Sequence, residues 1–152
     1  KCEKHGMNHK RSIRVNQEFC QAILQGECDP NRIPEEFQET WEENGNLLMD
    51  FYADFQMRYF RPRVVVEYDR TAYLYDVGNV RITLDRNISA TGKVHAFLER
   101  NPSLFPIMSP GIHVLEVKFD EFLPDFLHHS MELQGLRKTA YSKYYYSRLF
   151  CG

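Results

Sequence analysis

Cysteine is scarce in this sequence and is not arranged in pairs. The four cysteines among the 152 residues are Cys2, Cys20, Cys28 and Cys151, and none of them forms a C-x-x-C pair. Their spacings match no zinc-binding motif, so no structural zinc site is expected. We expect free thiols in a reducing compartment, and hence a cytoplasmic protein, with disulfides as the alternative.

Long apolar runs and an excess of one charge are missing as well. No stretch of about 18 apolar residues occurs, so no membrane span is predicted. The 19 basic and 21 acidic residues give a formal net charge of -2, which does not favour a nucleic-acid partner. No glycine-rich phosphate loop is present, which argues against a P-loop kinase. Any anion site must therefore come from a local arrangement of charge.

Aromatic residues, in contrast, are abundant at 14%, which suits a packed domain over residues 1–152. Asn16 precedes a short helical pattern that ends at Gly26. Pro34 begins a longer helical pattern that reaches residue 60, and a further helix is predicted over residues 124–135. The segment 137–150 is predicted as a terminal helix, with a strand as the alternative.

A strand period of two appears between these helical patterns. Residues 63–88 predict an antiparallel hairpin around the turn 76–79, and residues 111–122 predict another strand. Residues 1–5 predict a short strand. Helices, then strands, then helices indicate an α+β fold with an antiparallel sheet.

The three main predicted strands each carry a polar or charged row beside an apolar row. The polar rows contain Tyr68 and Arg70; Arg81, Thr83 and Asp85; and Glu116, Lys118 and Asp120. A sheet with one face in water explains such rows and is the plainer interpretation. The alternative is a curled sheet whose ionic face lines a cavity for a polyanion and a divalent metal, with the apolar face packed against helices.

Three strings carry a resemblance to a known family: VVVEYDRTAYLYDVGNVRITLDRNI, PGIHVLEVKFDEFLPDFL and RKTAYSKYYYSRLF. Together they resemble the VTC domain, the polyphosphate polymerase module of the vacuolar transporter chaperone complex, and in particular its bacterial homologues. That family belongs to the triphosphate tunnel metalloenzymes, also called CYTH-like proteins. The resemblance implies an antiparallel β-barrel that encloses a charged tunnel, with helices packed outside.

The resemblance also implies roles for individual residues. Arg70, Arg81 and Lys143 would be catalytic cations, and Glu116 would hold Mn²⁺ or Mg²⁺. The phosphates of ATP or polyphosphate would be bound by Arg14, Tyr68, Arg70, Arg81, Ser142 and Lys143. The implied activity is metal-dependent phosphoryl transfer, as in a polyphosphate polymerase.

The sequence also departs from the family pattern. The opening strands of the family are not found here, so the chain is expected to hold an incomplete tunnel. Position 140 is Ala, where the eukaryotic polymerases have a basic residue. A tunnel-type triphosphatase, a non-catalytic polyphosphate sensor and an inactive fragment of a longer enzyme are the alternatives.

Overall fold

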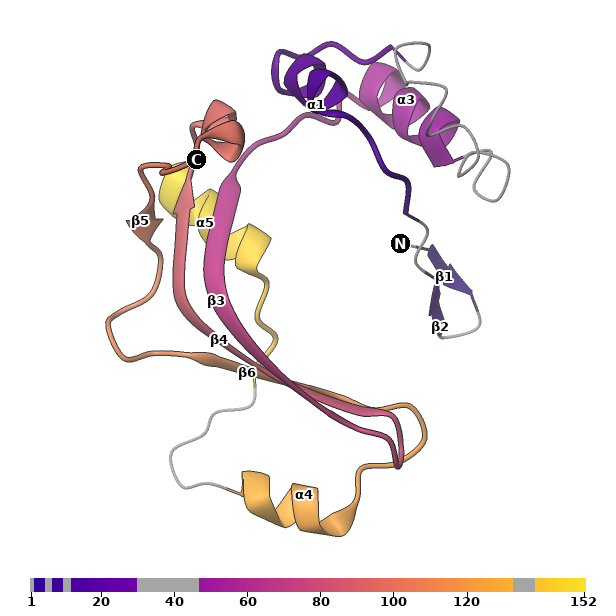
Figure 1. The fold of residues 1–152 in the computed structure, drawn as a ribbon, viewed down its shortest axis with the longest axis vertical. Helices are drawn as coiled ribbons and strands as arrows, with labels where there is room; N and C mark the ends of the chain where they lie inside the picture. The colour runs from indigo at the N-terminus through magenta and orange to yellow at the C-terminus, as the bar shows by residue number, and fades with distance from the viewer. Residues whose placement is uncertain (1, 5–6, 10–11, 30–46, 133–138) are drawn as a thin grey trace. The chain divides into compact units, whose positions relative to one another are not determined.

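The structure is a computed structural model that describes residues 2–4, 7–9, 12–29, 47–132 and 139–152. The chain divides into two compact units, Lys1–Pro62 and Arg63–Gly152 (Figure 1). The prediction of a single domain over residues 1–152 stays a prediction.

The first unit contains a small hairpin and two helices: β1 (Cys2–Lys4), β2 (Met7–His9), α1 (Gln17–Leu24) and α3 (Leu47–Met57). The predicted first strand and first helix are confirmed. Asn16 caps α1, because its side-chain oxygen accepts a hydrogen bond from the backbone N–H of Phe19 at 2.8 Å. The longer predicted helix is confirmed over Leu47–Met57, and its residues 34–46 lie outside the described residues.

The two helices of this unit share a small apolar core. Phe19, Cys28, Leu48 and Phe55 are buried together. Arg61 closes one side, since its guanidinium carbon lies 3.6 Å from the centre of the Phe55 ring. Cys20, Cys28 and Cys151 are free thiols, as predicted, and the side chain of Cys2 lies outside the described part.

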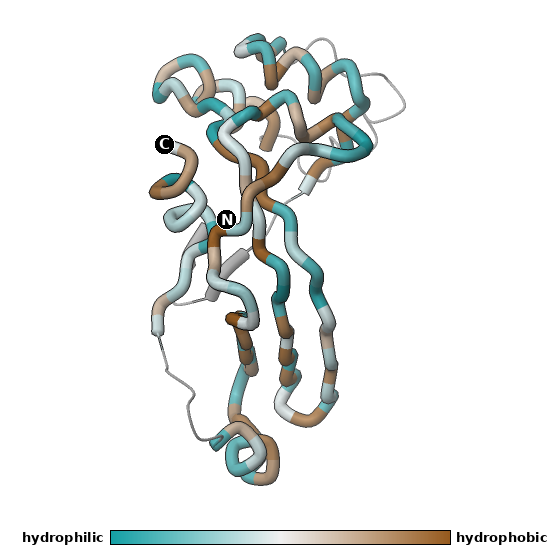
Figure 2. Tube along the Cα trace, turned by 90° about the vertical axis from the view of Figure 1, so that its left-hand side faces the viewer, coloured by the Kyte–Doolittle hydropathy of each residue, from teal (hydrophilic) through white to brown (hydrophobic). Residues whose placement is uncertain are grey.

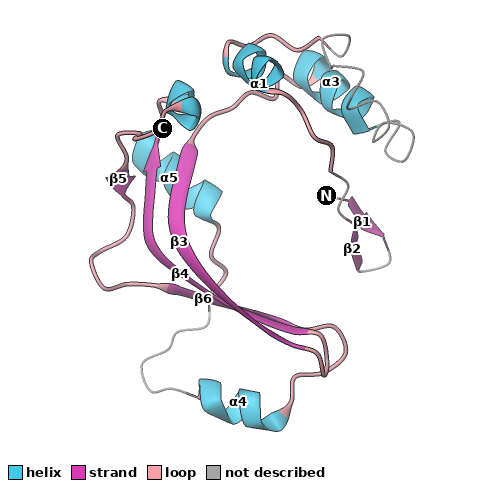
Figure 3. Cartoon of the chain, in the orientation of Figure 1, coloured by secondary structure: helices cyan, strands magenta, loops and turns pink. Residues whose placement is uncertain are grey.

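The second unit is built on an antiparallel sheet (Figure 3). Its elements are β3 (Val65–Tyr75), β4 (Val80–Thr91), the 3₁₀ helix η3 (Val94–Leu98), β5 (Phe105–Pro106), β6 (Val114–Lys118), α4 (Asp125–Met131) and α5 (Lys143–Cys151). The predicted hairpin and the strand after it are confirmed, although β4 continues three residues past the predicted end at residue 88. The predicted terminal helix is confirmed over Lys143–Cys151, whereas residues 139–142 are irregular and residues 137–138 lie outside the described residues. Neither η3 nor β5 was predicted.

Strand β4 is the centre of this sheet. It pairs with β3 along its length, with β6 through residues 81–85 and with β5 through residues 89–90. The mixed class of helices and antiparallel sheet is therefore confirmed. Over the ranges that the structure describes, the sheet is open, so a closed barrel is not seen there.

A tight turn joins β3 to β4 at the tip of the hairpin. Gly78 and Asn79 have φ values of 78° and 48°, and the backbone N–H of Asn79 donates to the carbonyl oxygen of Asp76 at 3.1 Å. A side chain at Gly78 would also collide with the backbone of Phe122. The predicted turn is confirmed, and glycine is required at this position.

A β-bulge changes which residues of β4 share a face. Figure 2 shows the alternation of hydrophilic and hydrophobic residues along β3 and β4. The register shifts between Glu67 and Asp69, where β4 holds an extra residue. The face that carries Asp85 is therefore continued by Ile88 and Ala90.

The bulge overturns one expectation about the helices. Tyr146 and Cys151 of α5 pack against the cluster of Ile88, Ala90 and Ile107. Helix α5 therefore covers one end of the face that carries the ionic row, whereas the sequence predicted helices on the opposite, apolar face. The extra residue in β4 is the reason, since it brings apolar side chains onto the ionic face.

Candidate functional site

The strand register arranges nine residues of three strands in a lattice. Across β3, β4 and β6 its rows are Arg70–Asp85–Val114, Ala72–Thr83–Glu116 and Leu74–Arg81–Lys118. Directly opposite residues of antiparallel strands have neighbouring side chains on the same face. The lattice therefore places long charged side chains around Ala72 and Thr83, the two small residues in the middle row.

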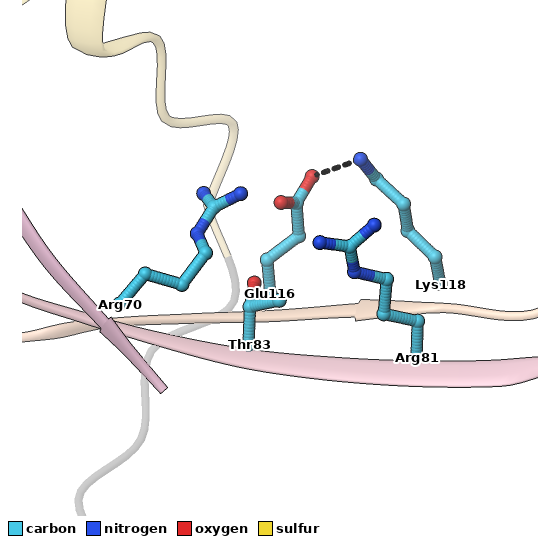
Figure 4. Close-up of a pocket in the computed structure, with 5 residues that line it drawn as sticks. All are labelled: Arg70, Arg81, Thr83, Glu116 and Lys118. Carbon is cyan, nitrogen blue, oxygen red and sulfur yellow. Dashed lines mark ion pairs between the residues drawn. The ribbon is translucent and has the colours of Figure 1, made fainter. Parts of the chain in front are cut away.

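A small pocket opens at the centre of this lattice. Five residues line it, and all of them project from the same side of the sheet (Figure 4): Arg70, Arg81, Thr83, Glu116 and Lys118. Its volume is about 50 Å³, which is more than a single water molecule requires. Lys118 Nζ lies 3.0 Å from a carboxylate oxygen of Glu116; the Lys118 side chain is 67% exposed and that of Glu116 40%. The pocket holds three cations and one carboxylate.

Asp85 lies beside the pocket and is completely buried. Arg70 Nε donates to Oδ1 of Asp85 at 2.6 Å, and Arg70 Nη2 donates to Oδ2 at 2.8 Å. Lys143 is the first residue of α5, and its Nζ lies 2.6 Å from Oδ2 of Asp85. The carboxylate thus joins β3, β4 and α5, and it holds Arg70, which lines the pocket, and Lys143 at the start of α5.

These contacts favour the charged forms of both partners. The Arg70 guanidinium holds the pKa of Asp85 at about 2, below its ordinary value of 3.8, and Lys143 acts in the same direction. The hydrogen bonds to Asp85 raise the pKa of Arg70 above its usual range. Asp85 is therefore ionised throughout the physiological range of pH.

The aromatic ring of Tyr68 lies close to the same two cations, Arg70 and Lys143. The centre of its ring lies 5.0 Å from Cζ of Arg70 and 4.9 Å from Nζ of Lys143. A cation over an aromatic face is attracted by the ring, more strongly where water is excluded. Tyr68 also packs against the cluster under α5, so it links that cluster to the ionic residues.

Helix α5 begins at the site. The Ser142 side-chain oxygen accepts a hydrogen bond from the backbone N–H of Tyr145 at 3.3 Å, which makes Ser142 the N-cap of the helix. This cap sets the position of Lys143, the first residue of α5. Ser142 therefore has a structural role of its own, beside the phosphate contact that the sequence predicts.

The structure brings most of the predicted site residues together. Arg70, Arg81 and Glu116 line one pocket, and Lys143 and Tyr68 contact Arg70 or its partner Asp85. Arg14 is exposed in the first unit, and its role stays a prediction.

Three residues at the site have no role in the sequence-based prediction: Thr83, Asp85 and Lys118. All three belong to the polar rows, so alternation alone places them on the ionic face. What selects them is the register of β4 against β3 and β6, which a single sequence does not reveal.

The acidic residues at the site are few. Within the described ranges, no group of three or more His, Cys, Asp or Glu side chains could hold a metal ion. The oxygens of Asp85 are occupied by Arg70 and Lys143, so Glu116 is the carboxylate of this lattice that can turn to a cation.

No helix in the described part of the chain has the length and apolar character that a membrane crossing requires.

The chain was compared with models of known protein families. The family model described as the VTC domain matches residues 1–150, which is nearly the whole chain. Comparison with curated proteins and with solved structures finds no match.

Proposed function

We propose that this chain, which belongs to the VTC domain family, binds the phosphates of polyphosphate or ATP at the ionic pocket and transfers phosphoryl groups between them. The family itself indicates a polyphosphate-related function. The observation that carries the proposal is that Arg70, Arg81 and Glu116 line one pocket. A sheet face that merely met water would not require these three side chains to converge.

The charges around the pocket favour an anion. Arg81 and Lys118 lie directly opposite each other on β4 and β6, and like charges in such a pair repel. Glu116 pairs with Lys118, whereas Arg81 makes no side-chain hydrogen bond or ion pair within the described part of the chain. A phosphate between the two cations would relieve the repulsion and use the planar donor fork of Arg81.

A divalent metal fits this pocket only together with its ligand. Mg²⁺ and Mn²⁺ are commonly held by one or two carboxylates, with phosphate oxygens and waters as the remaining ligands. Glu116 can supply that single carboxylate, and it would leave Lys118 to do so. The metal, when bound, would neutralise negative charge on the phosphoryl group that is transferred.

The side chains of the chain itself would act mainly by position and charge. Arg70 keeps donors free after its two bonds to Asp85, and Lys143 keeps N–H groups free after its single bond. With Arg81 they would hold the phosphates in line and stabilise the transition-state charge. The acceptor would decide the reaction, because a second phosphate gives polymer and water gives hydrolysis.

The remaining predicted contacts belong to this proposal. Ser142 and Tyr68 would touch the phosphates next to Lys143, and a phosphate-binding role for Arg14 stays a prediction. A closed tunnel also belongs to it. Among the described strands, β3 and β6 each pair only with β4, so each has one edge that further strands of a barrel could use.

The test is an assay of the full-length protein with ATP and Mn²⁺, with long-chain polyphosphate and free phosphate as the measured products. Polymer would support the proposal, and phosphate alone would support a triphosphatase. Neither product, with tight polyphosphate binding that survives EDTA, would indicate a sensor. The absence of both products and of binding would contradict a polyphosphate-related role for this site.

Glu116→Gln tests the metal role within the same assay. The variant is expected to lose at least tenfold in metal-dependent activity and to keep most of its polyphosphate binding in EDTA, since the cations remain. Glu67→Gln is the matched control, because Glu67 is exposed on β3 and alternates with Tyr68 and Arg70 onto the opposite face. Equal activity of both variants would remove Glu116 from the site.

A further inference from the structure

Thr83 is a buried polar residue on the ionic face of the sheet. It stands in the middle of the strand lattice, between Ala72 of β3 and Glu116 of β6. Its relative exposure is 3%, although it lines the pocket with four charged side chains. Figure 4 shows its hydroxyl on the same side of the sheet as those side chains.

The hydroxyl of Thr83 has no hydrogen-bond partner within the described residues, and it is out of reach of bulk water. A buried polar group without a partner costs free energy, and most such groups in native proteins are paired. Valine has nearly the same shape and would avoid that cost. The hydroxyl therefore calls for a partner that the protein itself does not supply.

Two other buried hydroxyls also lack partners, those of Tyr141 and Ser147. Neither lines the ionic pocket: Tyr141 packs with the apolar cluster under α5, and Ser147 is a fully buried residue of α5. Thr83 differs from both because cations surround it. Its position therefore points to a ligand.

We propose that the Thr83 hydroxyl donates a hydrogen bond to a phosphate oxygen of the anion bound between Arg70, Arg81 and Lys118, an inference that rests on the proposed function. The three cations are donors only, so they attract a ligand rich in acceptor oxygens. Such a ligand gives the hydroxyl the acceptor that it lacks. Glu116 and Lys118 line the pocket with Thr83, and their side chains are 40% and 67% exposed, so they can move apart as the ligand enters.

Substitutions of Thr83 should affect thermal stability and phosphate binding differently. Thr83→Val removes a hydroxyl that is unpaired in the free protein, so its melting temperature is expected to rise by a few degrees. The same variant is expected to bind inorganic tripolyphosphate about tenfold more weakly, since it loses a hydrogen bond to a charged group. Thr83→Ser keeps the hydroxyl and is expected to bind within about twofold of the wild type.

Thr91 supplies a matched control. It is a threonine of the same strand with the same 3% exposure, and its hydroxyl oxygen accepts a hydrogen bond from the backbone N–H of Lys93 at 3.3 Å. Thr91→Val is therefore expected to lower the melting temperature and to leave tripolyphosphate affinity unchanged. The two valine variants should move stability in opposite directions.

The experiment measures thermal unfolding without ligand and calorimetric binding of tripolyphosphate in EDTA, both on the full-length protein. Weaker binding by Thr83→Val together with higher stability supports the inference. Unchanged binding or lower stability of Thr83→Val overturns it. A wild-type protein that binds no tripolyphosphate overturns the proposed function as well, which distinguishes the two failures.

Discussion

Residues at the two ends of β4 lie on the same face of the strand, but one end is buried under α5 and the other is exposed. Ile88 and Ala90 are 2% and 0% exposed beneath α5. Arg81, at the other end, is exposed and stands beside Glu116 and Lys118 in an ionic pocket. The half with Ile88 and Ala90 stabilises the sheet by apolar burial. The half with Arg81 keeps like charges close together, and a bound anion would offset their repulsion.

Asp85 lies at the boundary between the two halves. Its carboxylate is buried like the apolar half, but its partners Arg70 and Lys143 reach toward the ionic half, with 31% and 21% of their side chains exposed. Burial around Asp85 therefore orders the cations that the pocket uses. The buried end of the sheet thus holds Arg70 in place beside the exposed end.

The largest expected effect comes from the apolar half. Ile88→Ala should lower the free energy of unfolding by about 3 kcal/mol, because it leaves a cavity under α5. Tripolyphosphate affinity of the folded fraction should stay within about twofold. Ile112→Ala is the control, since Ile112 is 52% exposed and its truncation should cost little. A loss of tripolyphosphate affinity without a loss of stability would contradict a purely stabilising role for Ile88.

An intermediate effect is expected at the boundary. Asp85→Asn should lower the free energy of unfolding on the order of 2 kcal/mol at neutral pH, which corresponds to the shift of the Asp85 pKa from 3.8 to about 2. A lowered pKa stabilises the folded state above the unfolded value. That contribution is therefore complete above about pH 5 and is lost as the pH falls through 2.

Denaturant unfolding at a series of pH values measures this contribution. The difference between wild type and Asp85→Asn should shrink below pH 4 and disappear near pH 1. Asp120→Asn is the control, because Asp120 accepts a hydrogen bond from Asn79 at the surface. A difference that stays constant with pH would show that Asp85 contributes through its shape and not through its charge.

Local patterns predicted most of the fold. Asn16 indicated the start of α1, and the period of two in residues 63–88 predicted the hairpin, because capping and alternation act between near neighbours. The 3₁₀ helix η3 and the two-residue strand β5 have no comparable signal. Their formation depends on contacts with β3 and β4.

The candidate site was predicted only in part, for a physical reason. Alternation placed Arg70, Arg81 and Glu116 on polar rows, and the family resemblance implied that these rows bind phosphate. The pairing of Asp85 with Lys143 joins residues 58 positions apart, and no local pattern encodes it. The bulge in β4 changed the face of every residue beyond it, which is why α5 lies on the ionic face.

Two arginines of β4 allow a direct test of whether its ionic face binds phosphate. Arg81 and Arg86 lie on the same strand and are both exposed. Arg81 lines the pocket, whereas Arg86 lies on the opposite face, where its guanidinium donates to the hydroxyl of Thr71 at 3.3 Å. Substitution of either arginine by glutamine changes the net charge by the same amount.

The decisive measurement is the affinity of the full-length wild type, Arg81→Gln and Arg86→Gln for tripolyphosphate by calorimetry at one fixed salt concentration. Arg81→Gln is expected to bind tripolyphosphate about tenfold more weakly, since it loses a charge-assisted hydrogen bond, whereas the affinity of Arg86→Gln should change by less than twofold. Equal losses in the two variants would show that only net charge attracts the anion, and would contradict a phosphate site on this face.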